Sequence, residues 1–123
     1  MAIKVLLVDD QKIFRFLASE WITEKFGNNF CFIEASNYSQ AVEKFITEQP
    51  QLVITDIQMP GENGIELTSF IKNKKHDIPV IIFSSSNNPE YRGTAVRLNA
   101  FFSDKGSEEE FIAAFKKCLD IIC

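Results

Sequence analysis

A short unbroken apolar run, Leu52-Val53-Ile54, stands between Pro50 and Pro60-Gly61 and constrains the fold more than any other segment. A run of this length, with β-branched residues and turn-forming residues on both sides, is typical of a strand buried on both faces, as in a parallel sheet. Asp56 comes where this strand ends, at the carboxyl edge where open α/β sheets bind their ligands. On this segment alone, a ligand-binding Asp56 and an Asp56 that merely starts a turn are equally good interpretations.

Two further apolar runs end in polar residues in the same way. Residues 3–8 precede Asp9-Asp10, and residues 79–83 precede Ser84. If these strands are parallel neighbours of the strand before Asp56, all of these side chains converge at one edge of the sheet. The alternation of such strands with helical segments along the chain predicts a parallel α/β sheet with right-handed crossovers.

Three carboxylates at one edge of a sheet require charge compensation. Asp9, Asp10 and Asp56 cannot crowd together at neutral pH unless a cation offsets their repulsion or they take up protons. No histidine or cysteine is among them, and an all-oxygen cluster suits a hard cation such as Mg²⁺. Lys105 follows a fourth short apolar run at residues 100–102. Considered alone, Lys105 is best interpreted as a solvated surface charge and Ser84 as part of a polar loop. Only their occurrence together with the three acids indicates that both are site residues.

These residues occur in the order and spacing of the response-regulator receiver domains of two-component signalling, which the chain resembles from Ile3 to about Ile122. The resemblance rests on five motifs in order: Val8-Asp9-Asp10, a D-x-x-M-P-G segment within residues 55–61, Gly64, Ser84 and Lys105. It implies a flavodoxin-like, doubly wound α/β fold with a five-stranded parallel sheet in the order 2-1-3-4-5 and five helices. Residues 1–123 would form a single receiver domain.

The resemblance also implies a role for each site residue. Asp56 would be the nucleophile that becomes phosphorylated, and Asp9, Asp10, Asp56 and the backbone carbonyl of Gln58 would hold Mg²⁺. Lys105 and the Ser84 hydroxyl would contact phosphoryl oxygens. Ser84 would act together with an aromatic residue of the fifth strand, Phe102, as the conformational switch.

Partners follow from the same resemblance. A histidine kinase or a phosphotransfer protein would supply the phosphoryl group from a phosphohistidine, and a downstream protein target would bind the face of the fourth helix, fifth strand and fifth helix. The domain would catalyse its own phosphorylation and its own slow dephosphorylation. A phosphorelay intermediate, or a receiver excised from a larger regulator, is the alternative within the family.

The lysine motif departs from the family pattern in one respect. Receivers commonly have proline after this lysine, joined through a cis peptide bond, whereas Gly106 follows Lys105. A cis bond before a residue other than proline costs roughly 2.5–4 kcal/mol, so the Lys105–Gly106 bond is predicted to be trans.

The segment before the fifth strand also departs from the pattern. Receivers usually have Gly-Ala there, and this chain has Asn99-Ala100. Asparagine can replace glycine in the left-handed backbone conformation, so Asn99 is predicted to adopt it. Phe102, three residues before Lys105, is preferred to Phe101 as the switch aromatic.

Helices are expected over residues 11–26, 38–48 and 64–75, with a fourth opened by Asn87-Asn88-Pro89 and a fifth by Ser107. In the first helix, Phe14, Leu17 (with Ala18) and Trp21 are expected to face the sheet. Ile13 and Phe16 would then be left exposed as a docking patch near the acidic pair. In the second helix the expected inward residues are Ala41, Val42 or Phe45, and Ile46.

Composition excludes several other classes. A net charge of −4 with mixed signs gives no basic footprint for direct nucleic-acid binding. No run approaches membrane-spanning length, and the two acids that end the first apolar run argue against a signal peptide. Three cysteines without metal or disulfide spacing are typical of free thiols in a cytoplasmic protein; they are Cys31, Cys118 and Cys123.

Two rival functions fit the residues less well. A phosphatase of the haloacid-dehalogenase type would require an acid two residues after Asp56, where Gln58 stands. A flavin- or dinucleotide-binding module would require a glycine-rich loop after the first strand, where Asp9-Asp10 would repel phosphate. A degenerate receiver would have lost one of the five site residues, and all five are present.

Overall fold

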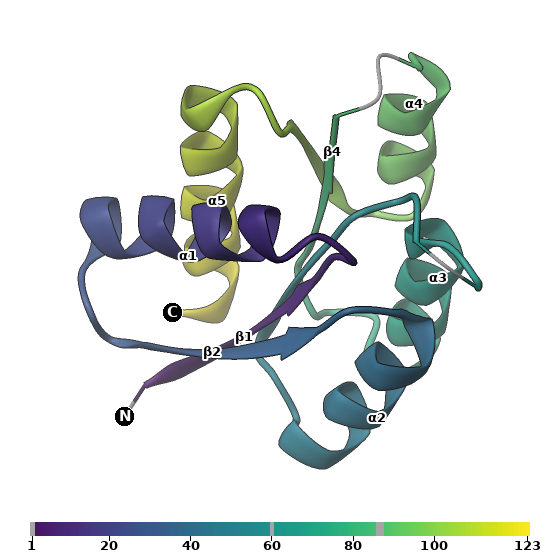
Figure 1. Cartoon of the computed structure of the whole chain (residues 1–123), viewed down its shortest axis with the longest axis horizontal. Coiled ribbons are helices and arrows are strands. Elements are labelled where there is room, and N and C mark those ends of the chain that lie inside the picture. The colour runs from purple at the N-terminus through teal and green to yellow at the C-terminus, as the bar shows by residue number, and fades with distance from the viewer. Residues whose placement is uncertain (1, 60, 86–87) are drawn as a thin grey trace.

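Strands and helices alternate along the computed structural model, which describes residues 2–59, 61–85 and 88–123 (Figure 1). The strands are β1 (Ile3–Val8), β2 (Phe30–Ala35), β3 (Leu52–Thr55), β4 (Val80–Ser84) and β5 (Phe101–Asp104). The helices are α1 (Lys12–Phe26), α2 (Tyr38–Glu48), α3 (Gly64–Lys74), α4 (Glu90–Arg97) and α5 (Glu108–Ile122). None of the helices in these ranges is long and apolar enough to span a membrane.

The five strands form one parallel sheet in the order β2-β1-β3-β4-β5. This confirms the predicted fold class and strand order. Neighbouring strands are in register near their carboxyl ends, with Val8 opposite Thr55 and Ser84 opposite Asp104. The residues that follow these pairs therefore emerge at the same edge of the sheet.

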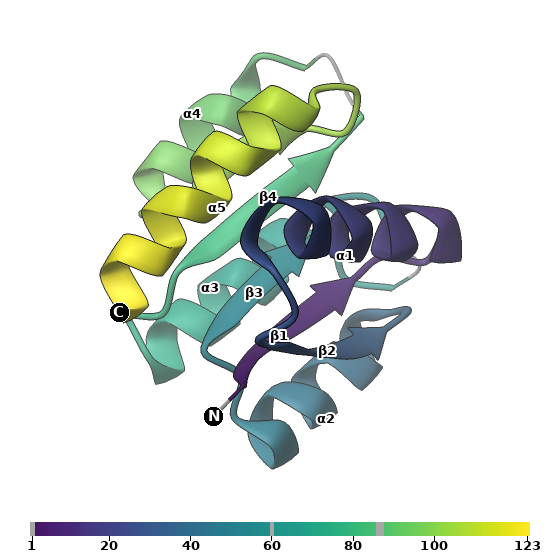
Figure 2. The ribbon, with the colours of Figure 1, turned by 90° about the vertical axis from the view of Figure 1, so that its left-hand side faces the viewer.

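The helices cover both faces of the sheet. Helices α1 and α5 lie on one face and α2, α3 and α4 on the other, as the two views show (Figures 1 and 2). Under α1 and α5 the core is rich in aromatic rings, and Phe111 contacts Trp21, Phe83 and Phe115 at centroid distances of 5.5, 5.0 and 6.2 Å. Much of the high phenylalanine content therefore fills this side of the core.

Local backbone chemistry explains where the helices begin and end. The side chains of Asn37, Asn63 and Ser107 accept backbone N–H groups at the starts of α2, α3 and α5, which satisfies donors that have no partner inside a helix. Gly27 follows α1 with a φ of 94°. Asn99 has a φ of 57°, which confirms its predicted left-handed conformation.

The inward face of α1 agrees with the prediction in part. Ala18 and Ile22, one turn apart, are fully buried, whereas Phe14, Leu17 and Trp21 are only partly buried. Trp21 nevertheless faces the sheet, since its ring centroid lies 6.0 Å from that of Phe83 in β4. Ala18 belongs to the predicted stripe, whereas Ile22, one turn further along the same face, does not.

A second correction concerns α2. Ile46 is 57% exposed rather than buried, because Ala41 and Phe45 already form the inward face and the next residue is turned away by about 100°. The predicted turn at Pro60 and the predicted helix-opening role of Asn87 fall on residues outside those that the structure describes.

Candidate functional site: an acidic pocket at the carboxyl edge of the sheet

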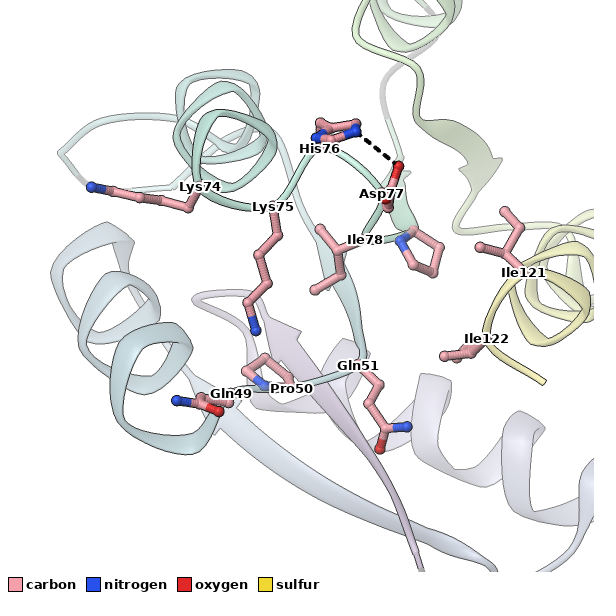
Figure 3. A pocket seen from close by; sticks show the side chains of 11 residues that line it. Gln49, Pro50, Gln51, Lys74, Lys75, His76, Asp77, Ile78, Ile121 and Ile122 are labelled. Atoms are coloured by element: carbon pink, nitrogen blue, oxygen red, sulfur yellow. Dashed lines mark ion pairs between the residues drawn. The ribbon is translucent and has the colours of Figure 1, made fainter.

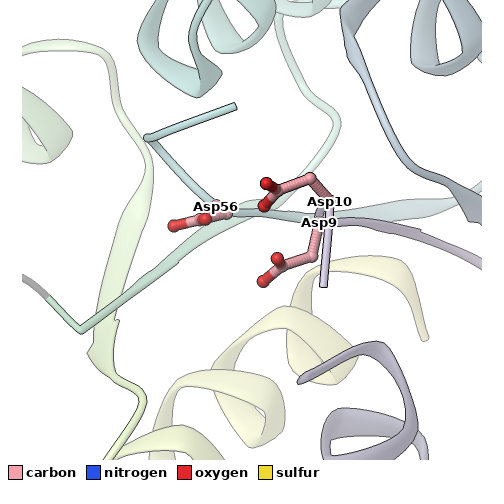
Figure 4. A group of neighbouring side chains, drawn as sticks. All are labelled: Asp9, Asp10 and Asp56. Carbon is pink, nitrogen blue, oxygen red and sulfur yellow. The ribbon is translucent and has the colours of Figure 1, made fainter. Parts of the chain in front are cut away.

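Asp9, Asp10 and Asp56 converge at the carboxyl edge of the sheet. Each offers a carboxylate oxygen, and these oxygens all lie within 4.8 Å of one another (Figure 4). Asp9 and Asp56 are buried, whereas Asp10 is exposed. The structure thus brings Asp56 to the Asp9-Asp10 pair, which lies more than a third of the chain away in sequence, as the sequence predicted.

Backbone hydrogen bonds fix the positions of these acids. The N–H of Asp56 donates to the carbonyl of Val8 at 2.9 Å, so Asp56 continues the β1–β3 ladder by one residue. The N–H of Asp9 donates to the carbonyl of Ala35 at 3.1 Å on the other side of β1. The pocket is therefore an extension of the sheet, and its geometry depends on strand register rather than on a free loop.

Lys105 closes the pocket from the β5 side. Its ammonium Nζ lies 2.6 Å from Oδ2 of Asp9 and 3.3 Å from Oδ2 of Asp56, and its side chain is 3% exposed. The N–H of Lys105 donates to the carbonyl of Ser84 at 2.9 Å, which ties the lysine to the end of β4. The Lys105–Gly106 bond is trans, as predicted.

Burial raises the pKa of Asp56, the residue predicted to be phosphorylated. Desolvation raises the pKa of Asp56 above its ordinary value, the positive charge of Lys105 opposes this rise, and the charge of Asp9 adds to it. The N–H of Ile57 donates to Oδ1 of Asp56 at 2.8 Å, which orients the carboxylate. A buried, oriented carboxylate with an incompletely compensated charge is suited to bind a cation and to attack an electrophile.

The donor set fits Mg²⁺. All the side-chain oxygens in the cluster are carboxylate oxygens, the ligands that this hard cation prefers. Oδ2 of Asp9 is buried and accepts no hydrogen bond from the described residues, and the charge of Lys105 lies 2.6 Å from it. Gln58 lies in the loop after β3 and is exposed; its carbonyl as a further ligand stays a prediction.

The two predicted switch residues share one face of the sheet. Ser84 is buried at the end of β4, and Phe102 pairs with Ile82, two residues earlier on that strand. Phe102 packs with Ile82 and Ala95 toward α4, whereas Phe101 packs into the core under α5. The role of Phe102 as the switch aromatic stays a prediction.

Sequence reasoning missed several residues that support the site. Arg15 donates to the carbonyl of Asp9 and pairs with Glu34 at 2.8 Å, linking α1 to β2. The ring of Phe14 lies 4.0 Å from Nζ of Lys105. No sequence signal identifies these contacts, because they depend on how α1 sits against the sheet.

A second pair of missed residues lies on the face of α4, β5 and α5. Arg92 pairs with Glu110 through contacts of 2.6 and 3.1 Å, and its guanidinium lies 4.5 Å from the centroid of the Phe102 ring. Glu110 also accepts the N–H of Asp104 at 2.8 Å. The contacts of these residues connect α4 to α5 over the predicted switch aromatic.

The described residues also form a hollow away from the acidic pocket. A hollow of about 590 Å³ at the opposite edge of the sheet is lined by residues such as Pro50, Lys75, Ile78 and Ile122 (Figure 3). Its charged side chains are exposed to solvent.

The three cysteines are free, and burial raises the pKa of the Cys118 thiol to about 12, so this thiol is unreactive.

Comparisons with known proteins agree on one family. The family described as "Response regulator receiver domain" matches residues 5–114. The chemotaxis protein CheY of Halobacterium salinarum is 39% identical over 100 residues, which cover 81% of each chain. The Regulator of RpoS of Escherichia coli K12 is 30% identical over 95 residues, which are 77% of this chain but only 27% of that protein.

Solved structures share the fold. The chemotaxis protein CheY4 of Vibrio cholerae superposes with a TM-score of 0.80 at 19% identity, covering 96% of this chain and 99% of that one. NtrX of Brucella abortus superposes with a TM-score of 0.84 at 26% identity, covering 98% of this chain and 27% of that one. Receiver domains of this family bind Mg²⁺ at an acidic pocket, and this chain has the corresponding aspartate cluster. The chain belongs to the response-regulator receiver domains of two-component signalling.

Proposed function

We propose that residues 1–123 form a single phosphoacceptor receiver domain that takes a phosphoryl group onto Asp56. The observation that carries this proposal is the convergence of Asp9, Asp10 and Asp56 within 4.8 Å beside the buried ammonium of Lys105. Phosphoryl transfer needs mainly positioning and charge neutralisation, and this pocket supplies an oriented nucleophile and a fixed positive charge.

The proposed transfer step takes place at the carboxylate of Asp56. A carboxylate oxygen of Asp56 attacks the phosphorus of a phosphohistidine, and a P–O bond forms as the P–N bond to the donor imidazole breaks. The leaving nitrogen keeps the electron pair and takes up a proton. Asp56 becomes an aspartyl phosphate, and hydrolysis by water later restores the carboxylate and releases inorganic phosphate.

The other residues of the pocket would bind the metal ion and the phosphoryl oxygens. Asp9, Asp10, Asp56 and the carbonyl of Gln58 would hold Mg²⁺, which when bound neutralises charge on the carboxylates and the phosphoryl group. Lys105 exchanges part of its contact with Asp56 for a phosphoryl oxygen. The Ser84 hydroxyl donates to another phosphoryl oxygen and moves Phe102 with it, altering the face of α4, β5 and α5.

The partners of the domain are then proteins. A histidine kinase or a phosphotransfer protein supplies the phosphoryl group, and a downstream protein binds the altered face. The relatives support this signalling role: they include a protein-glutamate methylesterase/protein-glutamine glutaminase of Clostridium acetobutylicum, 37% identical over 83 residues, which are 68% of this chain and 24% of that protein. We place the domain in the cytoplasm, where such kinases present their phosphohistidines.

Labelling with acetyl phosphate tests the proposal. With Mg²⁺ present, the parent chain should gain the mass of one phosphoryl group, and the modification should be labile to acid. Asp56→Asn, or the parent chain with Mg²⁺ removed by a chelator, should gain none. Labelling of Asp56→Asn to the level of the parent would show that Asp56 is not the acceptor.

A further inference from the structure

We propose that Phe14 is a positioning residue for phosphoryl transfer: its ring holds the ammonium of Lys105 in the acidic pocket. The inference rests on the proposed function, since it assigns Lys105 a partner in that reaction. Phe14 lies in the first turn of α1, and its ring centroid is 4.0 Å from Nζ of Lys105. The ring thus contacts the charged end of the side chain that faces both buried carboxylates.

Lysine needs such a support because its side chain is a flexible four-carbon stem with a compact charge. The backbone end of Lys105 is fixed by its hydrogen bond to Ser84, and the following turn is fixed by Asp104, which accepts the N–H of Gly106 at 2.7 Å. These contacts hold the backbone only. Placement of the ammonium depends on what surrounds Nζ.

The carboxylates attract the ammonium without orienting it fully. Nζ lies 2.6 Å from Oδ2 of Asp9, yet this oxygen accepts no well-directed hydrogen bond from the described residues. Nζ is 3.3 Å from Oδ2 of Asp56. The two carboxylates attract the ammonium, and its position depends also on the other groups that contact Nζ.

Aromatic rings supply the missing constraint. The Phe14 ring is in contact with Nζ, and the Phe83 ring lies further away, at 6.0 Å. A ring face attracts a cation through its quadrupole, and this attraction is stronger where water is excluded. The Lys105 side chain is only 3% exposed, whereas Phe14 is partly exposed, so the ring also helps to cover the ammonium.

The consequence for catalysis is specific. Lys105 must weaken its contact with Asp56 and approach a phosphoryl oxygen without leaving the pocket. A ring face suits this task, because it attracts the ammonium over a broad area and does not compete for a hydrogen bond. Loss of the ring should therefore slow phosphorylation through Lys105 and through no other group.

The test compares Phe14→Leu, which keeps apolar bulk, with Phe14→Tyr, which keeps a ring. Phe70→Leu is the matched control, because the Phe70 ring also lies near a lysine, 5.7 Å from Nζ of Lys74 on α3. Melting curves verify that each variant is folded, and Phe14→Met replaces Phe14→Leu if the latter is not.

The first measurement does not depend on phosphorylation. In protein carrying ¹³C-labelled lysine, the ε-methylene signal of Lys105, identified by its loss in Lys105→Arg, should be shifted upfield by the Phe14 ring current. Most of the shift should disappear in Phe14→Leu, with a remainder from the more distant Phe83 ring, and the shift should persist in Phe14→Tyr and Phe70→Leu. An unchanged signal in Phe14→Leu overturns the inference.

The second measurement is the rate of labelling by acetyl phosphate with Mg²⁺. Phe14→Leu should slow it roughly two- to thirtyfold, the range set by the strength of a cation–π contact, and Phe14→Tyr should restore most of the rate. In a Lys105→Ala background, Phe14→Leu should have no further effect; additive losses would mean that Phe14 acts through general packing and would overturn the inference. If the parent chain takes up no label, the proposed function fails, while the ε-methylene signal still decides whether Phe14 holds Lys105.

Discussion

The α-carbon of Gly64 lies against the backbone carbonyl of Asp56 so closely that no side chain fits between them. A β-carbon on Gly64 would come within 1.8 Å of that carbonyl oxygen. The N–H of Gly64 donates to the carbonyl of Ile57 at 2.9 Å, and Asn63 caps the helix that begins there. The start of α3 is thus docked onto the loop that carries Asp56.

Replacing Gly64 should therefore destabilise the fold and displace the loop that carries Asp56. We expect Gly64→Ala to lower the free energy of unfolding by about 2–4 kcal/mol, because backbone atoms on both sides must separate. Gly93→Ala is the control: the nearest atom to its new β-carbon is a guanidinium nitrogen of Arg97 at 3.5 Å, so this change should stabilise α4 by about 0.5–1 kcal/mol. Urea denaturation measures both, and a Gly64→Ala variant as stable as the parent would contradict the docking.

Asp56→Asn should stabilise the fold in a pH-dependent way. Burial, opposed by Lys105 and reinforced by Asp9, raises the pKa of Asp56, so the folded state holds this proton more tightly than the unfolded state. Stability therefore falls as pH rises through the raised pKa, and the ionised carboxylate is destabilising at neutral pH. The amide removes that cost.

Thermal unfolding between neutral and mildly acidic pH measures this effect. The gain from Asp56→Asn should be largest at neutral pH, should shrink as pH falls through the folded-state pKa, and should vanish below the ordinary value of 3.8. Asp77→Asn, at a side chain that is 90% exposed, should show little change at any pH. A gain that grows on acidification would have the wrong sign for a raised pKa.

The sequence predicted the strands and the acidic cluster because both depend on local pattern and parallel register. Once β1 and β3 are neighbours, residues that follow Val8 and Thr55 must share an edge, and Asp9 and Asp56 do so. The contact of Phe14 with Lys105 could not be predicted in this way. It depends on the rotation of α1, which Ala18 and Ile22 determine by packing against the sheet.

The ion pair between Arg92 and Glu110 could not be predicted for a similar reason. It joins α4 to α5, and the distance between these two helices is set by tertiary packing and not by local sequence. Each strand of this chain can be recognised from a few consecutive residues. The side chains that contact the site residues depend instead on how the helices pack against the sheet and against one another. Motif order predicts the five site residues, whereas the side chains that contact them depend on tertiary packing.

Mg²⁺ should stabilise the folded chain, because it offsets repulsion among Asp9, Asp10 and Asp56 in the native state alone. At about 100 times its dissociation constant, the gain should be about 2.7 kcal/mol. Asp10→Asn should reduce the Mg²⁺-dependent rise in melting temperature, and Asp77→Asn should leave it unchanged. A rise of equal size with KCl at matched ionic strength would indicate screening instead of a metal site.

The pairing of Arg92 with Glu110 should couple α4 to α5. The hydrogen bond from Arg92 lowers the pKa of Glu110, so its stabilisation is fully present above the ordinary value of 4.5 and is lost as pH falls through the folded-state pKa. Both side chains are partly exposed, so a double-mutant cycle with Arg92→Gln and Glu110→Gln should give a coupling of only about 0.2–1 kcal/mol at neutral pH. A coupling that persists after Glu110 is protonated would show that the contact is not ionic.

Two exposed apolar side chains on α1 are expected to receive the phosphodonor. Ile13 is 62% exposed and Phe16 57% exposed, and they lie within the first two turns of the helix that follows Asp9-Asp10. Single exposed apolar residues are common, but two large ones beside a phosphorylation site suit a partner helix that brings its histidine to Asp56. Their exposure agrees with the prediction made from helical spacing.

The double variant Ile13→Ser with Phe16→Ser separates docking from chemistry. Phosphotransfer from the protein donor should fall, because the partner loses apolar contact area, while labelling by acetyl phosphate should stay at the parent rate. Ile46→Ser on α2, at a side chain that is also 57% exposed but lies on the other face of the sheet, is the control and should affect neither reaction. Equal loss of both reactions in the α1 variant would show that these side chains support the pocket itself. Loss of neither would show that the donor docks elsewhere.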